Sequence, residues 1–302
     1  LTTTAPVPMT MWGGAQTIDL PAEGGSSHRC ARCHQPRPMT ANAAYDPSGR
    51  LINYDSLKNY PGIMQYDTSA TAKNTGIRPS YRMHVHYGTV SAVVAGKGAI
   101  EYAGSRTYAN SAHTAAASCS DCHMASPMTG VAGGHSFNMR NGIETALSSG
   151  TTWNFNGCNT ADCHGATPIT ATSAAWKDTR AEIKTLLDAL AAKINEAGGG
   201  TDILHKDAST ANLWAGITTN NYDGYMDIYD ASANPSGYWR LPGNNTAVNL
   251  AKPKFPSLKN VQLGAIINFQ FCLREYSLGI HNTKYVKALL TNTTEALAAE
   301  GL

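Results

Sequence analysis

Residues 30–34 of the chain read Cys-Ala-Arg-Cys-His, and this short stretch decides how the rest of the sequence is interpreted. The pattern returns as Cys-Ser-Asp-Cys-His at residues 119–123. It returns again at residues 158–164 as Cys-Asn-Thr-Ala-Asp-Cys-His, with two extra residues between the cysteines. The three copies use six of the seven cysteines in the chain, so paired thiols followed by an imidazole form a repeated unit.

This repeated unit is typical of the covalent attachment of c-type haem. The two thiols add to the two vinyl groups of a haem, and the histidine that follows becomes the proximal ligand of its iron. We therefore expect three covalently bound c-type haems. The attachment residues are Cys30, Cys33, Cys119, Cys122, Cys158 and Cys163, and the proximal ligands are His34, His123 and His164.

Paired cysteines also bind zinc, act as redox dithiols or form disulfides. A structural zinc site takes four ligands, usually from two Cys-x-x-Cys pairs, and does not need a histidine after every pair. A thioredoxin-like dithiol lies beside a βαβ pattern, and the sequence has none near these motifs. The repeated histidine favours haem, and metal binding and disulfide formation stay as the alternatives.

The composition of the 302 residues suits an exported protein that is organised by cofactors. Only 15% of the residues are charged and 8% are aromatic, and haems add apolar surface to a thin core. The net charge of +2 comes without a basic run, which argues against a nucleic-acid partner. No stretch resembles a signal peptide or a membrane span. Because c-type haem is attached outside the cytoplasm, we expect a periplasmic or extracellular protein whose signal peptide has been removed.

Clear helical periodicity is confined to the C-terminal part of the chain. Apolar residues recur at helical spacing between Ser173 and Gly198, and two more helices are predicted at about 258–277 and 283–300. Cys272 is expected to be a buried residue of the second of these helices. The polar stretch 201–256, with its carboxylates at 221–230, is interpreted as loop rather than as a calcium site.

These patterns predict a mostly α fold with extensive loop and no sheet of consequence. Residues 1–170 form a trihaem-binding region that has little periodicity of its own. Residues 171–302 form a helical region that packs on the haems, and we expect the two regions to make one continuous domain.

Each iron needs a second axial ligand, and the sequence offers many histidines for this role. A second histidine is usual at a low-potential electron-transfer haem, whereas methionine raises the potential. None of the nine methionines stands in an obvious ligand setting, so we expect two histidines at every iron. The histidines outside the attachment motifs are His28, His84, His86, His113, His135, His205 and His281.

A series of short motifs, in order, resembles the multihaem c-type cytochromes of metal-reducing bacteria. These cytochromes share a haem core with cytochrome c nitrite reductase and hydroxylamine oxidoreductase. The resemblance covers about residues 80–300, and the first eighty residues match nothing beyond their haem motif. The motifs are HVHYG at 84–88, EYAG at 101–104, NSAH at 110–113, CSDCHM at 119–124, GGHSF at 133–137, FQFCLRE at 269–275 and HNTKY at 281–285.

The resemblance implies that each distal histidine serves a haem attached elsewhere in the sequence. Carried over by position, His113 is the distal ligand of the haem attached at His164. In the same way His135 serves the haem at His34, and His281 serves the haem at His123. His113 also lies too close to Cys119 in sequence to fold easily over the haem of that motif, which favours a neighbouring haem.

The remaining histidines are weaker candidates. His28 precedes Cys30 by two residues, so it cannot cap its own haem and would have to serve another. Relatives use a histidine near His84 and His86 to cap an upstream haem, which this chain does not have. The pair is therefore free, packed near a propionate, or a ligand for another subunit. His205 is expected to be a surface residue.

The resemblance implies extracellular electron transfer by the repeating subunit of a cytochrome filament. The partners would be further copies of the chain, other redox proteins or extracellular electron acceptors. We expect no nucleic-acid partner and no membrane span. A monomeric periplasmic carrier is the runner-up. A reductase of nitrite, hydroxylamine or a sulfur oxyanion needs an open iron, which nitrite-reducing relatives mark with Cys-x-x-Cys-Lys. That motif is absent from the sequence, so no enzyme is expected. Asn244 and Asn292 begin acceptor patterns for N-glycosylation.

Overall fold

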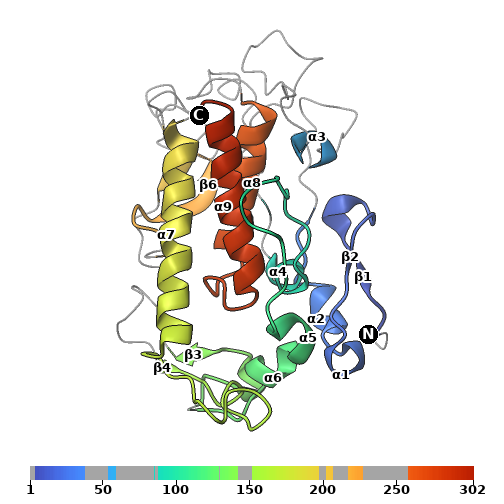
Figure 1. Ribbon diagram of the computed structural model, residues 1–302. Coiled ribbons are helices and arrows are strands. Elements are labelled where there is room, and N and C mark those ends of the chain that lie inside the picture. The colour runs from blue at the N-terminus through green and yellow to red at the C-terminus, as the bar shows by residue number, and fades with distance from the viewer. Residues whose placement is uncertain are drawn as a thin grey trace, which may run out of the picture.

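Three long helices dominate the computed structural model of the chain, and they lie side by side (Figure 1). They are α7 (Ala174–Glu196), α8 (Asn260–Leu273) and α9 (Thr283–Ala299), as the sequence predicted apart from a few residues at their ends. The described part of the chain is partly helical, with small sheets and long irregular segments. The structure describes residues 4–37, 54–58, 85, 88–128, 130–141, 152–196, 202–206, 217–226 and 258–302.

Helix α8 forms the centre of the molecule, because every one of its residues is buried. Its apolar residues are spread around the helix rather than confined to one stripe, which suits such an enclosed position. Cys272 belongs to this helix and is 1% exposed, which confirms the prediction that it is a buried helix residue. Helix α7 instead buries one stripe, made of Ile183, Leu187, Leu190 and Ile194.

Short helices gather near one end of the three long ones (Figure 1). These are α1 (Ala22–Gly25), α2 (His28–Ala31), α5 (His113–Ala116) and α6 (Cys119–His123). Further along the bundle lie α3 (Tyr54–Lys58), which contacts α8, and α4 (Val90–Ala95). Two single turns of 3-10 helix, Thr10–Trp12 and Gly134–Ser136, are the other helical elements of the described residues.

The strands pair only as two-stranded antiparallel ribbons in the described residues. The pairs are β1 (Val7–Pro8) with β2 (Thr17–Ile18), β3 (Arg140–Asn141) with β4 (Thr152–Trp153), and β5 (Leu204–Lys206) with β6 (Tyr222–Met226).

The ribbon of β5 and β6 corrects the prediction of loop for residues 204–206 and 222–226. The apolar side chains of this polar stretch explain the difference, because Tyr222 and Met226 are buried and the Tyr222 ring packs edge-on against Phe269 of α8. Asn195 of α7 holds the ribbon in place, since its side chain accepts hydrogen bonds from the backbone N–H groups of Ile203 and Leu204. Residues 227–230 lie outside the described part.

Buried asparagines fasten the irregular segment after α4 to the long helices. The Asn268 side chain accepts from Ile100 N–H at 2.8 Å and donates to Ile100 C=O at 2.7 Å. Asn292 forms the same reciprocal pair with the N–H and C=O of Arg106, at 3.0 and 2.9 Å. Each side chain therefore takes the place of a neighbouring strand and satisfies backbone groups that have no sheet partner. The buried core draws on residues from both predicted regions.

This role of Asn292 excludes it as a glycosylation site in the folded chain. Its side chain is fully buried and its amide nitrogen donates to the carbonyls of Tyr102 and Arg106. Asn244 lies outside the described residues. Among the helices described, none combines the length and apolar character needed to cross a bilayer.

Candidate haem sites

In the first and third cysteine motifs, the backbone N–H of the histidine donates a hydrogen bond to the carbonyl of the first cysteine. The N–H of His34 donates to the carbonyl of Cys30 at 2.9 Å, and the N–H of His164 donates to the carbonyl of Cys158 at 2.9 Å. The two added residues of the third motif are taken up in a turn, in which Cys163 N–H donates to Thr160 C=O. The widened spacing therefore keeps the histidine in the same backbone relation to the first cysteine.

The second motif coincides with helix α6. Ser118 starts this helix with a capping box: its hydroxyl accepts from Asp121 N–H, and the Asp121 carboxylate accepts from Ser118 N–H at 2.7 Å. A single helical turn follows, and residues three and four apart share one face of a helix. Cys119, Cys122 and His123 therefore point to a common side.

Cysteines of different motifs lie next to one another. Burial raises the pKa of Cys119, and the nearby Cys30 thiol adds to this effect. A hydrogen bond with Cys158, and behind it burial, raises the pKa of Cys122, while the same bond lowers the pKa of Cys158. The second motif thus lies between the first and the third. All six motif thiols are free and at least partly exposed.

His123 and His281 form the first of two histidine pairs. Their ring centroids are 6.2 Å apart and their planes differ by 19°. His123 Nδ1 donates to the carbonyl of Phe137 at 2.8 Å, and His281 Nδ1 lies 2.7 Å from a carboxylate oxygen of Glu275. Because both acceptors hold the proton on Nδ1, each ring keeps Nε2 for a metal.

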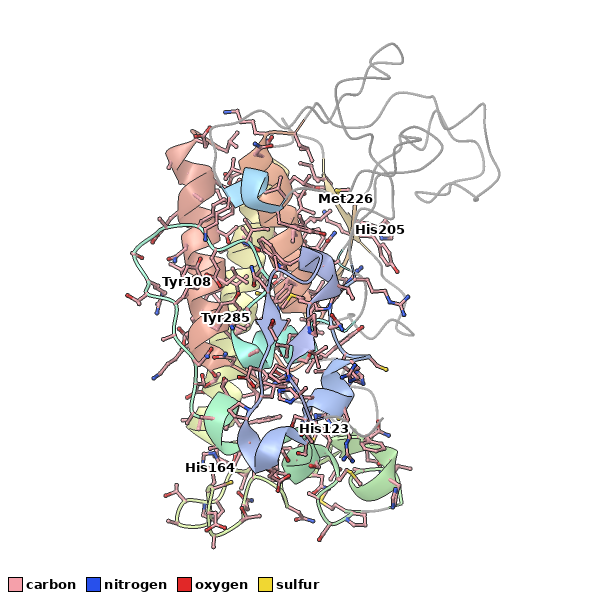
Figure 2. All side chains as sticks on the ribbon, turned by 90° about the vertical axis from the view of Figure 1, so that its right-hand side faces the viewer. Tyr108, His123, His164, His205, Met226 and Tyr285 are labelled. Carbon is pink, nitrogen blue, oxygen red and sulfur yellow. The ribbon has the colours of Figure 1, made fainter. Side chains whose placement is uncertain are left out.

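His113 and His164 form the second pair. Their ring centroids are 6.3 Å apart and their planes are nearly perpendicular, at 79°. His113 Nδ1 donates to the carbonyl of Ile280 at 2.9 Å, which again leaves Nε2 for a metal. Since Ile280 precedes His281, the two pairs share one segment of chain. Figure 2 shows His123 and His164 at the same end of the molecule.

Both separations fit a metal ion held between two imidazoles. A metal–imidazole bond is about 2.0–2.1 Å long and the ring centre lies about 1.1 Å further, so two facing rings would have centroids about 6.2–6.4 Å apart. Ordinary aromatic contacts span about 4.5–7 Å and include this value. The hydrogen bonds at Nδ1 are therefore the more specific feature, because they leave one nitrogen on each of three rings, His113, His123 and His281, for a ligand bond.

The third predicted pair, His34 with His135, stays a prediction. His135 lies in the 3-10 turn Gly134–Ser136, and both rings are exposed. Burial lowers the pKa of His123, and the neighbouring His281 and His34 rings lower it further. His34 therefore lies near the second motif. A lowered pKa keeps His123 neutral, which is the form that binds a metal.

The weaker candidates for iron ligands are His28, His84 and His86, and His205 was expected at the surface. His28 is 2% exposed, and both ring nitrogens are occupied: Nε2 accepts from Leu20 N–H at 2.8 Å and Nδ1 donates to Thr4 C=O at 2.5 Å. In this fold its ring has no nitrogen left for a metal. His84 and His86 lie outside the described residues. His205 is half-buried in β5 rather than fully on the surface.

Glu275 is the residue of this site that the sequence analysis missed. Its carboxylate is fully buried and accepts from Gly279 N–H at 2.6 Å, from the Ser277 hydroxyl at 2.6 Å and from His281 Nδ1. Burial acts to raise the pKa of Glu275, but the bond from His281 and the other two donors hold it below its ordinary value. Glu275 ends the FQFCLRE motif, but the motif alone gave it no role, because its partners come together only through the turn at 275–281.

Strained backbone surrounds the first histidine pair. Phe137, whose carbonyl holds His123, has a φ of 57°. Tyr276 and Leu278, which lie in the turn between Glu275 and His281, have φ values of 62° and 54°. Residues with side chains rarely adopt such angles, and those that do cluster at functional sites. The turn and the Phe137 carbonyl therefore hold this pair at a cost in backbone energy.

Three large apolar side chains that follow the second motif are exposed. Met124, Val131 and Phe137 are exposed by 40%, 45% and 53%, and they are the large apolar side chains most exposed in the described residues. A porphyrin face is a large apolar surface that such side chains can cover. Together with the free thiols and the histidine pairs, this surface fits a covalently attached haem.

Within the described ranges, no group of three or more His, Cys, Asp or Glu side chains is arranged to hold a metal ion. A haem iron takes four ligands from the porphyrin, so the pair of histidines is the relevant unit. The chain matches no family model, no curated protein and no solved structure.

Proposed function

We propose that the chain is an electron-transfer protein that holds three covalent c-type haems, each with two axial histidines. The observation that carries this proposal is the pairing of His123 with His281 and of His113 with His164. Each pair joins the histidine of a Cys-x-x-Cys-His-type motif to a histidine distant from it in sequence. The resemblance to multihaem cytochromes implies these same two pairs.

The residues of the chain divide the work of holding the cofactor. The paired cysteines fix it covalently, and the histidines after them supply the proximal nitrogen. Hydrogen bonds from Nδ1 to Phe137, Ile280 and Glu275 fix the ring orientations and present Nε2. When bound, haem supplies a one-electron carrier.

Two histidines at each iron favour electron transfer over catalysis. A reductase of nitrite, hydroxylamine or a sulfur oxyanion would need an open coordination position, which a second histidine closes. The haem core that the resemblance implies therefore supports a conduit, and the reductase rests on an analogy of fold alone.

The resemblance extends the proposal to location and assembly. The chain would act outside the cytoplasm, as the repeating subunit of a cytochrome filament that passes electrons to redox proteins or extracellular acceptors. A monomeric periplasmic carrier is the alternative, and it uses the same sites. The motif order from about residue 80 to residue 300 supports both forms equally.

The proposal is tested by expressing the whole chain in a host that matures c-type cytochromes. We expect a denatured mass equal to the polypeptide plus three haems, and a ferric absorption spectrum that is low-spin throughout. A chain that carries zinc or disulfides at these cysteines, and no haem, would refute the proposal. A stoichiometric high-spin haem that binds nitrite would instead favour the reductase.

A further inference from the structure

The two histidine pairs differ in two independent ways. The planes of His123 and His281 are nearly parallel, at 19°, whereas those of His113 and His164 are nearly perpendicular, at 79°. The Nδ1 atom of His281 also faces a buried carboxylate, whereas that of His113 faces a neutral backbone carbonyl. Both differences affect the reduction potential of an iron held between the rings.

We propose that Glu275 and the parallel ring planes make the His123/His281 haem the lower-potential site, and that the perpendicular His113/His164 pair holds a haem of higher potential. This inference rests on the proposed function, since it requires haems at both pairs. It assigns Glu275 as a positioning residue that tunes the iron through His281.

The ring planes act on the iron through its d orbitals. Each imidazole donates π electron density into the iron orbital perpendicular to its own plane. Two parallel rings raise the same orbital, which separates it from its partner and stabilises the ferric state, whose electron hole occupies it. Two perpendicular rings raise both orbitals equally and leave them close in energy. The parallel planes therefore lower the reduction potential of the His123/His281 site relative to that of the His113/His164 site.

Glu275 acts in the same direction. A carboxylate that accepts the Nδ1 proton makes the imidazole a stronger donor and places a negative charge near the iron, and both effects favour the ferric state. The charge is held in place by geometry, because the fully buried side chain receives hydrogen bonds from Gly279, Ser277 and His281. The carbonyl of Ile280 carries no net charge, so His113 is a weaker donor.

The first test is the electron paramagnetic resonance spectrum of the oxidised, haem-loaded protein. We expect a rhombic low-spin signal from the parallel pair and a highly anisotropic low-spin signal from the perpendicular pair. The variants H281A and H113A assign them: H281A should remove the rhombic signal and H113A the anisotropic one. The signal of the third haem persists in both variants and does not enter the comparison.

The second test follows each assigned signal during a potentiometric titration with dithionite and ferricyanide. We expect the rhombic signal to have the lower midpoint potential. The variant E275Q keeps an amide oxygen for His281 Nδ1 but removes the charge, so its rhombic signal should titrate at a higher potential. If the loss of the charge weakens the preference for ferric iron about tenfold, the midpoint potential of E275Q rises by about 59 mV.

The matched control is E295Q. Glu295 lies on helix α9, where its carboxylate accepts hydrogen bonds from Ser105 and has no contact with a histidine of either pair. The E295Q variant should leave both midpoints in place. A rhombic signal that titrates above the anisotropic one, or two assigned signals of the same type, would overturn the inference while leaving the haems intact. The wild-type spectrum decides this even if E275Q does not fold. Absence of any low-spin haem signal would overturn the proposed function itself.

Discussion

The side chain of Asn282 accepts a hydrogen bond from the backbone N–H of Ser111 at 2.9 Å, although 171 residues separate the two. The same side chain, which is fully buried, donates to the carbonyl of Val93 at 3.0 Å and accepts from Tyr285 N–H at the start of α9. His281 precedes Asn282 directly, and His113 follows Ser111 by two residues. One amide therefore fixes the segments that carry His281 and His113.

The variant N282A should lose stability and disturb both histidine pairs. It removes a helix cap and leaves several buried backbone groups without partners, so we expect a loss of about 2–4 kcal/mol in the free energy of unfolding. Urea denaturation measures this loss, and the visible spectrum should show high-spin haem. The matched control is N292A, an equally buried asparagine that binds the backbone of Arg106. It should cost a similar amount and keep the low-spin spectrum; a high-spin signal in N292A would contradict the specific role of Asn282.

The widened third motif is expected to carry a haem of its own. His164 closes on Cys158 through the same backbone bond that His34 makes with Cys30, so the added residues do not displace the imidazole. The double variant C158A/C163A should therefore reduce the denatured mass by one haem, from three to two. Mass spectrometry measures the number directly. A wild-type chain with only two haems would show that the added residues prevent attachment.

Each distal histidine should control the spin state of one haem. H281A and H113A remove the second nitrogen from different pairs, so each should convert one haem to the high-spin state and open it to cyanide. His205 supplies the control, because it lies in β5 and belongs to neither pair. We expect H205A to retain the wild-type spectrum. If H281A and H113A both stayed fully low-spin, the assignment of ligands would be wrong.

Glu295 should make a small, pH-dependent contribution to stability. Hydrogen bonds from the hydroxyl and then the N–H of Ser105 lower the pKa of Glu295 below its ordinary value of 4.5. A folded-state pKa below the unfolded one stabilises the fold above pH 4.5, and this stability is lost as the pH falls through the folded value. E295Q should be less stable than wild type by at most about 0.5 kcal/mol at pH 7, because the pair is partly exposed. Urea denaturation at pH 7 and pH 3 should show the difference shrinking at the lower pH. A difference that is larger at pH 3 would refute this sign.

Assembly into filaments is the least local of the expectations. Electron microscopy of the secreted, haem-loaded material should show helical filaments if successive copies meet head to tail, because an open contact of that kind propagates without closing. Isolated particles of about 32 kDa at high concentration would favour the monomeric carrier.

The elements that sequence reasoning predicted are those with a short repeat or a strong periodicity. Helix α7 has an apolar stripe and α8 is rich in apolar residues, so both were predictable. The ribbon of β5 and β6 was missed, because its tyrosines stand in a polar stretch and Tyr222 is buried only through tertiary contacts with α7 and α8. The resemblance implied the pairs His123/His281 and His113/His164, which the fold brings together.

For other residues of the site the sequence did not indicate the contacts they make, even where they lie in a motif of the resemblance. Glu275 is separated from His281 by six residues, and only the turn with positive φ angles at Tyr276 and Leu278 brings them into contact. Asn268, Asn282 and Asn292 look like ordinary polar residues of helices. Their role depends on backbone groups more than 160 residues away.

The place of His281 between α8 and α9 has a consequence for how the protein is completed. All three cysteine motifs precede it by more than a hundred residues, so in an exported chain they would leave the export machinery first. Haem attachment would need only the local motif, whereas His281 would reach the second motif only when the C-terminal helices have docked on residues 88–113. The visible absorption spectrum of a haem at the second motif would then report whether the C-terminal helices of the same molecule have folded.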